Sequence, residues 1–559
     1  MRTRTCLCAF IALLFESFVL AGSALAQVNT VYISQNGGPF SGGSACNGQT
    51  TQTQAWFNTS ANWTSGTPSG QQIGPGTLVY LCGTFTSGAL TFQGSGNSTN
   101  VIELLFDTGA NFTAAVWSPP PIQLNSKSYI LIDGGVPCGK DHGDDGLTAC
   151  STNLSGTGLM ENTANGTTLA NQTVSNFIVG ATTAAGNGCG SNIEIRNLLL
   201  LQAYQKNGAD SSTAADEAQA TWLVECGNNI NIHDLTSTWG HASIELDGPS
   251  GGASNWTIAY NVTAHATWGI KVAMGSSPAT LSNIIIHDND INNGTDWSDS
   301  SGIYHIDGIF TYGNSTTGYI DGAYIYNNYL HGTWGQGTQC PTGYEYISGW
   351  MTHTYIFNNV IYVTGQYSCN GDYAVVNEES VYLYNNTIVN VPTSAGQDLG
   401  AAGGAGPGGF VTAQNNITSG GLYTVNFSPG AQSDFSTWDH NDYYGYGESE
   451  PFRVGSSYYT WAQWQALTCG SSGCDANGSI GNPQLASSYP FTLGSGSAAI
   501  GLGANLYSVC NGQPNPGLGA LCYDRFGNAR PSSGNWDAGA YNYSTTAPQP
   551  PTGLTAVPH

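Results

Sequence analysis

The densest run of chemically reactive side chains lies between residues 241 and 307. Six of its side chains, two histidines, three carboxylates and one lysine, form the set of interest: His241, Glu245, Asp247, Lys271, His305 and Asp307. Paired carboxylates can act as acid and base in glycoside hydrolysis, and a carboxylate beside a lysine can support proton abstraction in a β-elimination. We take these six residues as the candidate catalytic set. The structural alternatives are a surface ion pair between Glu245 and Lys271, worth under about 1 kcal/mol, and corner or turn-capping roles for His305 and Asp307.

Aromatic residues form a second group, suited to holding a ligand. The triplet Thr-Trp-Gly occurs three times, and Tyr or Phe recurs along one outward face. A row of rings is rarely left bare to water, and such rings stack on the faces of sugars. The candidate substrate-binding residues are Trp239, Trp268, Trp334, Tyr326, Tyr355 and Tyr384. The alternative is that the C-terminal segment, itself rich in Tyr and Trp, lies over these rings and buries them.

The elements that must position these residues are eight related octamers, among them IIIHDNDI, AYIYNNYL and VYLYNNTI. They begin at residues 193, 230, 256, 284, 323, 354, 381 and 411. Repetition at this period is typical of a stacked architecture. The first and third positions are mostly aliphatic, so the second and fourth face outward. Asn or Asp at the fifth and sixth positions suits a corner, because it tolerates left-handed backbone and its amide can bond along a stack.

This pattern predicts an all-β chain whose short parallel strands pile up in register. Separate β-sandwiches would not explain the recurrence of one octamer at one-rung spacing. Glu245 and Lys271 each lie 15 residues after the start of their octamers, so we expect them to lie one above the other on the outer face. His233 and His287 occupy the outward fourth position and are expected to face solvent.

The chain resembles the secreted right-handed parallel β-helix proteins of the pectin-lyase-like superfamily. The resemblance rests on the octamers, on VYISQNGGPF and SYILIDGG near the start, and on DHNDYYGYG, YTWAQWQAL, DRFGNARP and NWDAGAYNY near the end. It implies a single-stranded β-helix with an N-terminal cap and a C-terminal tail packed on it. The expected segments are an export signal at 1–26, the cap and first coils at 27–180, the central repeats at 181–425, the helix end and tail at 426–544, and a Pro-rich linker or fibronectin type III start at 545–559.

Catalytic signatures of this superfamily are only partly matched. The polygalacturonase-like set is absent as a set, although residues 301–309, SGIYHIDGI, have a related look. Pectate-lyase-like sites need a basic residue beside carboxylates that bind calcium. Lys271 is the best basic candidate, and Lys206 and Arg196 are weaker ones. The sequence requires no cofactor, and bound Ca²⁺ is kept as an alternative.

Composition limits the partners. The formal net charge is −25, with 10 basic and 35 acidic residues, so nucleic acid is disfavoured and a neutral glycan is favoured over a polyuronate. Beyond the export signal no segment is apolar and long enough to span a membrane, and we expect a secreted or cell-surface monomer. An even number of cysteines in an exported chain predicts disulfides. The neighbouring pairs are 46/82, 138/150, 189/226, 340/369, 469/474 and 510/522.

The sequence therefore predicts an extracellular carbohydrate-active β-helix that cleaves, as a hydrolase or lyase, a polysaccharide bound along its outer face. The alternative is a β-helix without catalytic activity that binds polysaccharide or serves as a structural, adhesin-like rod.

Overall fold

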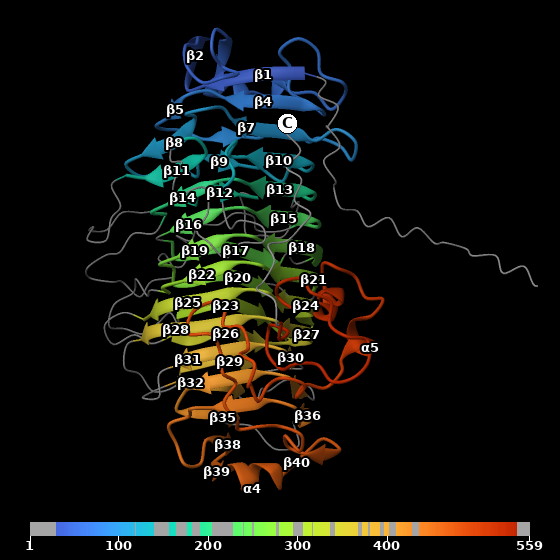
Figure 1. Ribbon diagram of the computed structural model, residues 1–559. Coiled ribbons are helices and arrows are strands. Elements are labelled where there is room, and N and C mark those ends of the chain that lie inside the picture. Colours follow the sequence, from blue (N-terminus) through green and yellow to red (C-terminus); the bar gives the residue numbers. More distant parts are fainter. Residues whose placement is uncertain are drawn as a thin grey trace, which may run out of the picture.

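Alternating aliphatic residues fold this chain into a right-handed parallel β-helix, seen in the computed structural model in Figure 1. The structure describes residues 29–117, 119–138, 156–163, 176–180, 190–203, 227–238, 240–248, 251–274, 279–294, 306–315, 317–335, 341–366, 372–377, 381–391, 396–401, 410–427 and 435–544.

The described strands form three long sheets, of which two run along most of the helix and the third begins at β17 (Figure 1). Sheet I contains, in spatial order, β2 (Asn36–Pro39), β3 (Thr50–Thr53), β1 (Asn29–Ser34), β4 (Thr77–Leu81), β7 (Ile102–Phe106), β10 (Ile130–Asp133), β13 (Ile193–Arg196), β15 (Ile230–His233), β18 (Ala253–Ala259), β21 (Ala279–His287), β24 (Gly318–Tyr326), β27 (Met351–Phe357), β30 (Val381–Tyr384), β33 (Val411–Gln414) and β36 (Phe435–Asp439).

Sheet II follows sheet I around each coil. It contains β37 (Asp442–Tyr444), β34 (Ile417–Gly420), β31 (Thr387–Val391), β28 (Val360–Gln366), β25 (Tyr329–Trp334), β22 (Asp290–Asn292), β19 (Val262–Ala264), β16 (Thr236–Thr238), β14 (Leu199–Leu201), β11 (Leu159–Asn162), β8 (Asn111–Ala114) and β5 (Thr84–Phe85).

Sheet III closes the coils of the second half. It contains β17 (Ala242–Gly248), β20 (Trp268–Met274), β23 (Ile306–Gly313), β26 (Pro341–Gly349), β29 (Asp372–Asn377), β32 (Gly396–Ala401), β35 (Tyr423–Phe427), β38 (Phe452–Val454) and β39 (Ser457–Tyr459). The remaining elements are β6 (Leu90–Thr91), β9 (Ile122–Gln123), β12 (Ile178–Val179), β40 (Thr468–Cys469), β41 (Ser472–Gly473), α1 (Gln54–Phe57), η1 (Ser60–Asn62), α4 (Trp461–Gln465), α5 (Tyr507–Cys510) and η3 (Leu518–Cys522).

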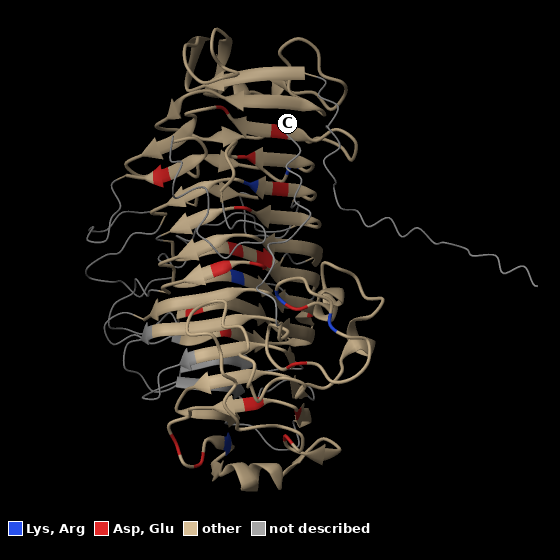
Figure 2. Ribbon diagram, viewed as in Figure 1, with Lys and Arg blue, Asp and Glu red and all other residues tan. Residues whose placement is uncertain are grey.

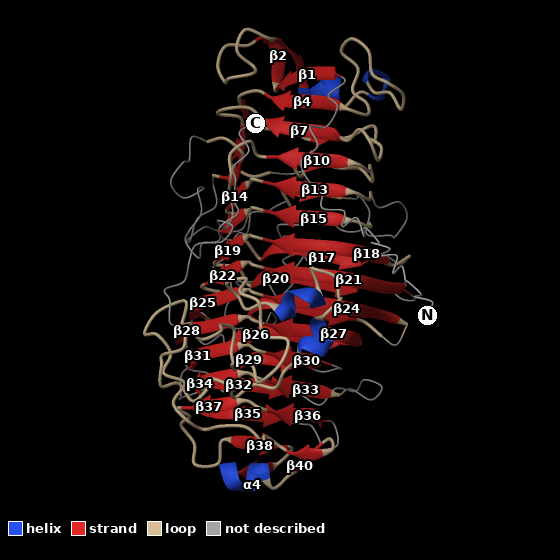
Figure 3. Cartoon of the chain, turned by 45° about the vertical axis from the view of Figure 1, so that its right-hand side comes forward, coloured by secondary structure: helices blue, strands red, loops and turns tan. Residues whose placement is uncertain are grey.

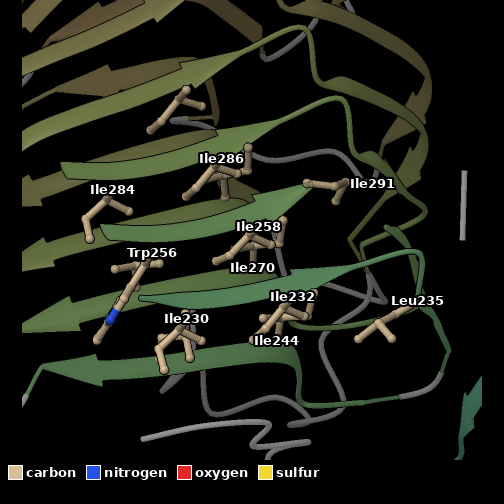
Figure 4. Close-up of a cluster of buried hydrophobic side chains, with 14 of the residues drawn as sticks. Ile230, Ile232, Leu235, Ile244, Trp256, Ile258, Ile270, Ile284, Ile286 and Ile291 are labelled. Carbon is tan, nitrogen blue, oxygen red and sulfur yellow. The ribbon is translucent and has the colours of Figure 1, made fainter. Parts of the chain in front are cut away.

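The predicted interior column is confirmed. Ile232 pairs with Ile258, Ile258 with Ile286, and Ile286 with Ile325, and each of the four is fully buried. Figure 4 shows the first three of these side chains pointing into the coil beside residues from the other sheets. Stacking in register therefore makes residues far apart in the sequence vertical neighbours, which is the condition for any site on an outer face.

The predicted Asn corners divide their work between two positions. At the fifth octamer position the backbone is left-handed, with φ of 56° at Asn327 and Asn358 and 54° at Asn385. The sixth position provides the amide ladder inside the coil, where Asn328 Nδ2 donates to Asn359 Oδ1 at 3.1 Å and Asn359 Nδ2 donates to Asn386 Oδ1 at 3.2 Å. Corner geometry and the amide stack thus come from adjacent residues rather than from one.

The C-terminal tail folds back onto sheet I, as predicted. Leu521 and Trp536 pack against Phe357 and Tyr384, and Arg530 Nη2 donates to Asn358 Oδ1 at 2.9 Å. Figure 1 shows α5 of this tail beside the coils of β24 and β27, and Figure 3 shows short helices lying in front of these strands. The tail therefore covers the outer face of these coils, and the coils from β10 to β21 lie on its N-terminal side.

Disulfides form where the predicted neighbours lie within the described residues. The bridges are Cys46–Cys82, Cys469–Cys474 and Cys510–Cys522, and Cys138 is also disulfide-bonded. The other predicted cysteines lie outside the described residues, as do the export signal and the linker at 545–559. Among the described helices, none has the length and apolar character needed to cross a membrane.

Candidate functional site

The predicted catalytic set is partly brought together on the outer face of sheet III. Glu245 on β17 pairs in register with Lys271 on β20, as expected from their equal offsets. Lys271 Nζ lies 2.5 Å from Glu245 Oε1 and 4.7 Å from the centroid of the Trp268 ring. The ring of His241 lies 4.7 Å from that of Trp268. The result is a compact cluster of one ion pair and two rings.

This cluster is closed rather than open. Glu245 is 2% exposed, and Asp307 is fully buried with its Oδ1 accepting a hydrogen bond from Gly343 N at 3.1 Å. Burial, helped by the charge of Lys271, lowers the pKa of His241 to about 3, so its ring is neutral. The Glu245–Lys271 pair is therefore not the weak surface pair of the simple alternative. Neither Glu245 nor Asp307 is open to a polysaccharide chain.

The remaining predicted residues of this set are spread apart or undescribed. Asp247 lies two positions beyond Glu245, in register with Ala273, and is partly exposed. His305 and Trp239 lie outside the described residues. The set of six therefore does not converge as one open site within the described part of the chain.

Four of the predicted aromatic residues have different surroundings. Trp334 was expected on the surface, but it is fully buried against Tyr344 in the interior, so it offers no ring to a ligand. Tyr384 is 4% exposed beneath the tail, which confirms the alternative of burial for this ring. Tyr355 is partly exposed in a stack with Tyr382, at 4.6 Å between ring centroids. Tyr326 lies at the edge of an open groove.

That groove is a concave feature of the outer face of sheet I. It has a volume of about 1150 Å³ and crosses the outward faces of β10, β13, β15, β18 and β21. The tail forms one end of it through Asn515, Tyr523 and Asp524. In Figure 1 the tail lies beside β21 and β24, with the N-terminal coils of sheet I beyond it. Five adjacent strands enclose four strand spacings, so the groove is roughly 19 Å long.

A charged centre lies in the N-terminal half of the groove. Arg196 Nη1 donates to Glu194 Oε1 at 2.9 Å, and Arg196 Nε donates to Asp133 Oδ2 at 2.7 Å. His233 is held on both sides, with Nε2 3.2 Å from Glu194 Oε1 and Nδ1 2.5 Å from Asp234 Oδ2. Figure 2 shows how few other charged residues the coils carry. The concentration of charge at this point is therefore a feature of the groove.

The surroundings fix the charge states in this centre. Burial alone would lower the pKa of His233, but hydrogen bonds and charges from Asp234 and Glu194 raise it to about 9. Burial alone would raise the pKa of Glu194, but His233 and Arg196 hold it below its usual range. Glu194 is thus a carboxylate supported by two cations at neutral pH.

The rest of the groove presents amides and rings. Asn229 Nδ2 donates to Asn192 Oδ1, and Asn255 Nδ2 donates to Asn229 Oδ1, both at 2.9 Å. These three exposed side chains form a ladder along one wall. At the tail end the rings of His287 and Tyr326 stack with centroids 4.9 Å apart, but the two residues are only 7% and 3% exposed. Tyr523 of the tail presents an exposed ring at this end. The groove can therefore offer hydrogen bonds, an exposed ring and a charged centre to one extended ligand.

Sequence reasoning did not find this groove. His233 and His287 were expected to face solvent without a role, and Arg196 was ranked as a weak base. The signal was present, because the outward fourth position reads Asp133, Arg196 and His233 on three consecutive rungs of sheet I. Aligning ILID of β10 with the octamers would have placed these charges in one column.

Several solved structures resemble this chain at low sequence identity, whereas no family model and no curated protein matches it. Pectate lyase Pel9A aligns over 93% of this chain and 98% of its own, at 13% identity and a TM-score of 0.43. A GH136 lacto-N-biosidase from Eubacterium ramulus covers 77% of this chain and 65% of its own, at 11% identity and a TM-score of 0.37. A mannuronic acid specific polysaccharide family 6 lyase from human gut microbiota covers 74% and 86%, at 9% identity and a TM-score of 0.35.

The architecture of this chain is a right-handed parallel β-helix, with a cap at the N-terminal end and a tail packed on sheet I.

Proposed function

We propose that this protein is an extracellular carbohydrate-active β-helix that binds a polysaccharide chain in the groove of sheet I. The observation that carries the proposal is the groove itself, about 1150 Å³ in volume and lined by amides, rings and a charged centre. Ligand sites combine a largely apolar concave surface with a few placed polar groups that fix orientation. A groove crossing several rungs suits a chain of several sugars better than a single one.

The ligand class that fits this groove is a neutral glycan. Its lining carries three carboxylates, Glu194, Asp288 and Asp524, against the cations Arg196 and His233. Both cations are already hydrogen-bonded to carboxylates of the protein. A polyuronate would bring further negative charge to a surface whose cations are occupied. Disulfides at both ends of the β-helix, Cys46–Cys82 and Cys469–Cys474, support an extracellular setting.

The test measures binding of the purified full chain to a panel of neutral and acidic polysaccharides by affinity electrophoresis and calorimetry. Thr257→Trp places a large ring in the middle of the groove, where Thr257 is partly exposed. Thr113→Trp makes the same change at a partly exposed position of β8 on sheet II and is the matched control. We expect Thr257→Trp to weaken binding of a neutral glycan at least tenfold and Thr113→Trp to leave it unchanged. Equal affinities for both variants, or no binding to any member of the panel, would refute the proposal.

A further inference from the structure

Two glutamates face outward from the same column of sheet I at the head of the groove. Glu103 on β7 and Glu194 on β13 are both in register with Leu131 on β10, one on each side. Neighbouring strands lie about 4.8 Å apart, so the two glutamate backbones are separated by roughly 9.6 Å. Leu131 lies between them as an apolar floor and itself lines the groove. The groove reaches Leu131 and Glu194, and Glu103 stands one strand beyond Leu131 on the same face of the sheet.

The two carboxyl groups have different surroundings. Glu194 accepts from Arg196 Nη1 at 2.9 Å and lies 3.2 Å from His233 Nε2. Glu103, in contrast, stands closest to other acids. Burial raises the pKa of Glu103, and the charges of Asp133 and Glu194 raise it further against the opposing charge of Arg196. Environments that push the pKa values of two carboxyl groups apart in this way prepare one group to act as an acid and the other as a base.

We propose that Glu103 and Glu194 are the general acid and the general base of a glycoside hydrolase centre that cleaves the polysaccharide held in this groove. The inference rests on the proposed binding function and adds the reaction class and its two catalytic residues. Arg196 and His233 act as positioning residues, since they hold Glu194 in place and keep it ionised.

The reaction is a single displacement by water. The Glu194 carboxylate takes a proton from water while the water oxygen forms a bond to the anomeric carbon. The bond between that carbon and the glycosidic oxygen breaks, and the leaving oxygen receives the proton of Glu103. The products are two shorter chains, one with a new reducing end, and exchange of a proton with solvent restores both glutamates. A carboxyl separation of about 6.5–9.5 Å is typical of enzymes that invert the anomeric configuration.

The two protonation states define a pH profile. The rate falls at low pH when Glu194 gains a proton, and it falls at high pH when Glu103 loses its proton. Because the pKa of Glu194 is lowered and that of Glu103 is raised, the optimum lies between these two pKa values, in a range that includes the ordinary pKa of a glutamate.

The experiment uses the full chain with the neutral polysaccharide that it binds, and measures new reducing ends, product configuration by NMR and binding affinity. Glu103→Gln and Glu194→Gln are compared with Glu161→Gln, which changes a partly exposed glutamate on β11 of sheet II. We expect the first two variants to lose at least 100-fold in rate with affinity within threefold of the wild type, and the control to keep both. We also expect the new reducing end to have inverted configuration.

The contrary outcomes separate this inference from the function on which it rests. Binding without cleavage, cleavage that survives in Glu103→Gln and Glu194→Gln, or unsaturated products would overturn the hydrolase centre and leave the binding function standing. Absence of binding to every neutral glycan would overturn both.

Discussion

Replacing Glu345 by Gln should make the stability of the fold much less sensitive to pH between pH 5 and pH 7. Glu345 lies on β26 in register with Ile309, in the column that continues to Ile270 and Ile244. All four side chains are fully buried. Neither carboxyl oxygen of Glu345 has a hydrogen-bond partner among the described residues. An acid thus occupies an apolar column, where its charged form is strongly disfavoured.

The size of the effect follows from the pKa. Burial raises the pKa of Glu345 from 4.5 to about 8. Between these two values the unfolded chain has lost the proton while the folded chain keeps it, so stability falls as pH rises. The slope is about 1.4 kcal/mol per pH unit. Glu345 alone should therefore cost about 3 kcal/mol at pH 7 relative to pH 4.5, and its contribution is fully favourable only below pH 4.5.

The assay is urea unfolding at pH 5, 6 and 7 for the wild type, Glu345→Gln and Glu450→Gln. Gln keeps the shape of Glu and cannot ionise. The unfolding free energy of Glu345→Gln should therefore fall by about 3 kcal/mol less than that of the wild type between pH 5 and pH 7. Asp442 and Asp475, whose pKa values burial raises to about 6, are present in all three proteins and cancel in the comparison. Glu450 is exposed, and its substitution should reproduce the wild-type slope. Identical slopes for the wild type and Glu345→Gln would refute the reasoning.

Three further predictions concern the framework. Lys271→Met should lower the unfolding free energy by about 3 kcal/mol, because it leaves the buried Glu245 without its cation. Glycan affinity should stay constant. A stability loss below about 1 kcal/mol, or weaker glycan binding, would count against a structural role for Lys271. Asn359→Leu interrupts the interior amide ladder on both sides and should cost about 2–4 kcal/mol in urea unfolding, whereas an unchanged midpoint would show that the ladder contributes little. The double substitution of Asn358 and Asn385 by Val puts β-branched residues at φ of 56° and 54° and should cost about 2–4 kcal/mol; unchanged melting would contradict the corner account.

The fold could be predicted because its determinants are local and repeated. Each octamer carries its own alternation and its own corner, so the column from Ile232 to Ile325 follows from spacing alone. The stacking of Glu245 on Lys271 followed from the same rule. The same rule did not predict that this ion pair is largely buried, because burial depends on what covers the outer face.

The residues whose position was predicted wrongly show where the inward–outward alternation of strand residues fails. Trp334 shares its Thr-Trp-Gly triplet with Trp268, yet one ring faces inward and the other outward. Successive residues Tyr344 and Glu345 are both fully buried on β26, which no period-two pattern predicts. The groove was missed for a different reason, since Glu103, Asp133 and Glu194 come from coils of very unequal length. Only the strand register brings them together.

A crystal structure of Glu194→Gln soaked with an oligosaccharide of the bound neutral glycan tests the central claim most directly. We predict sugar density along sheet I from Leu131 toward Tyr326, with one ring above Leu131 between residues 103 and 194. Density over the outer face of sheet III near Trp268, with the sheet I groove empty, would contradict the account.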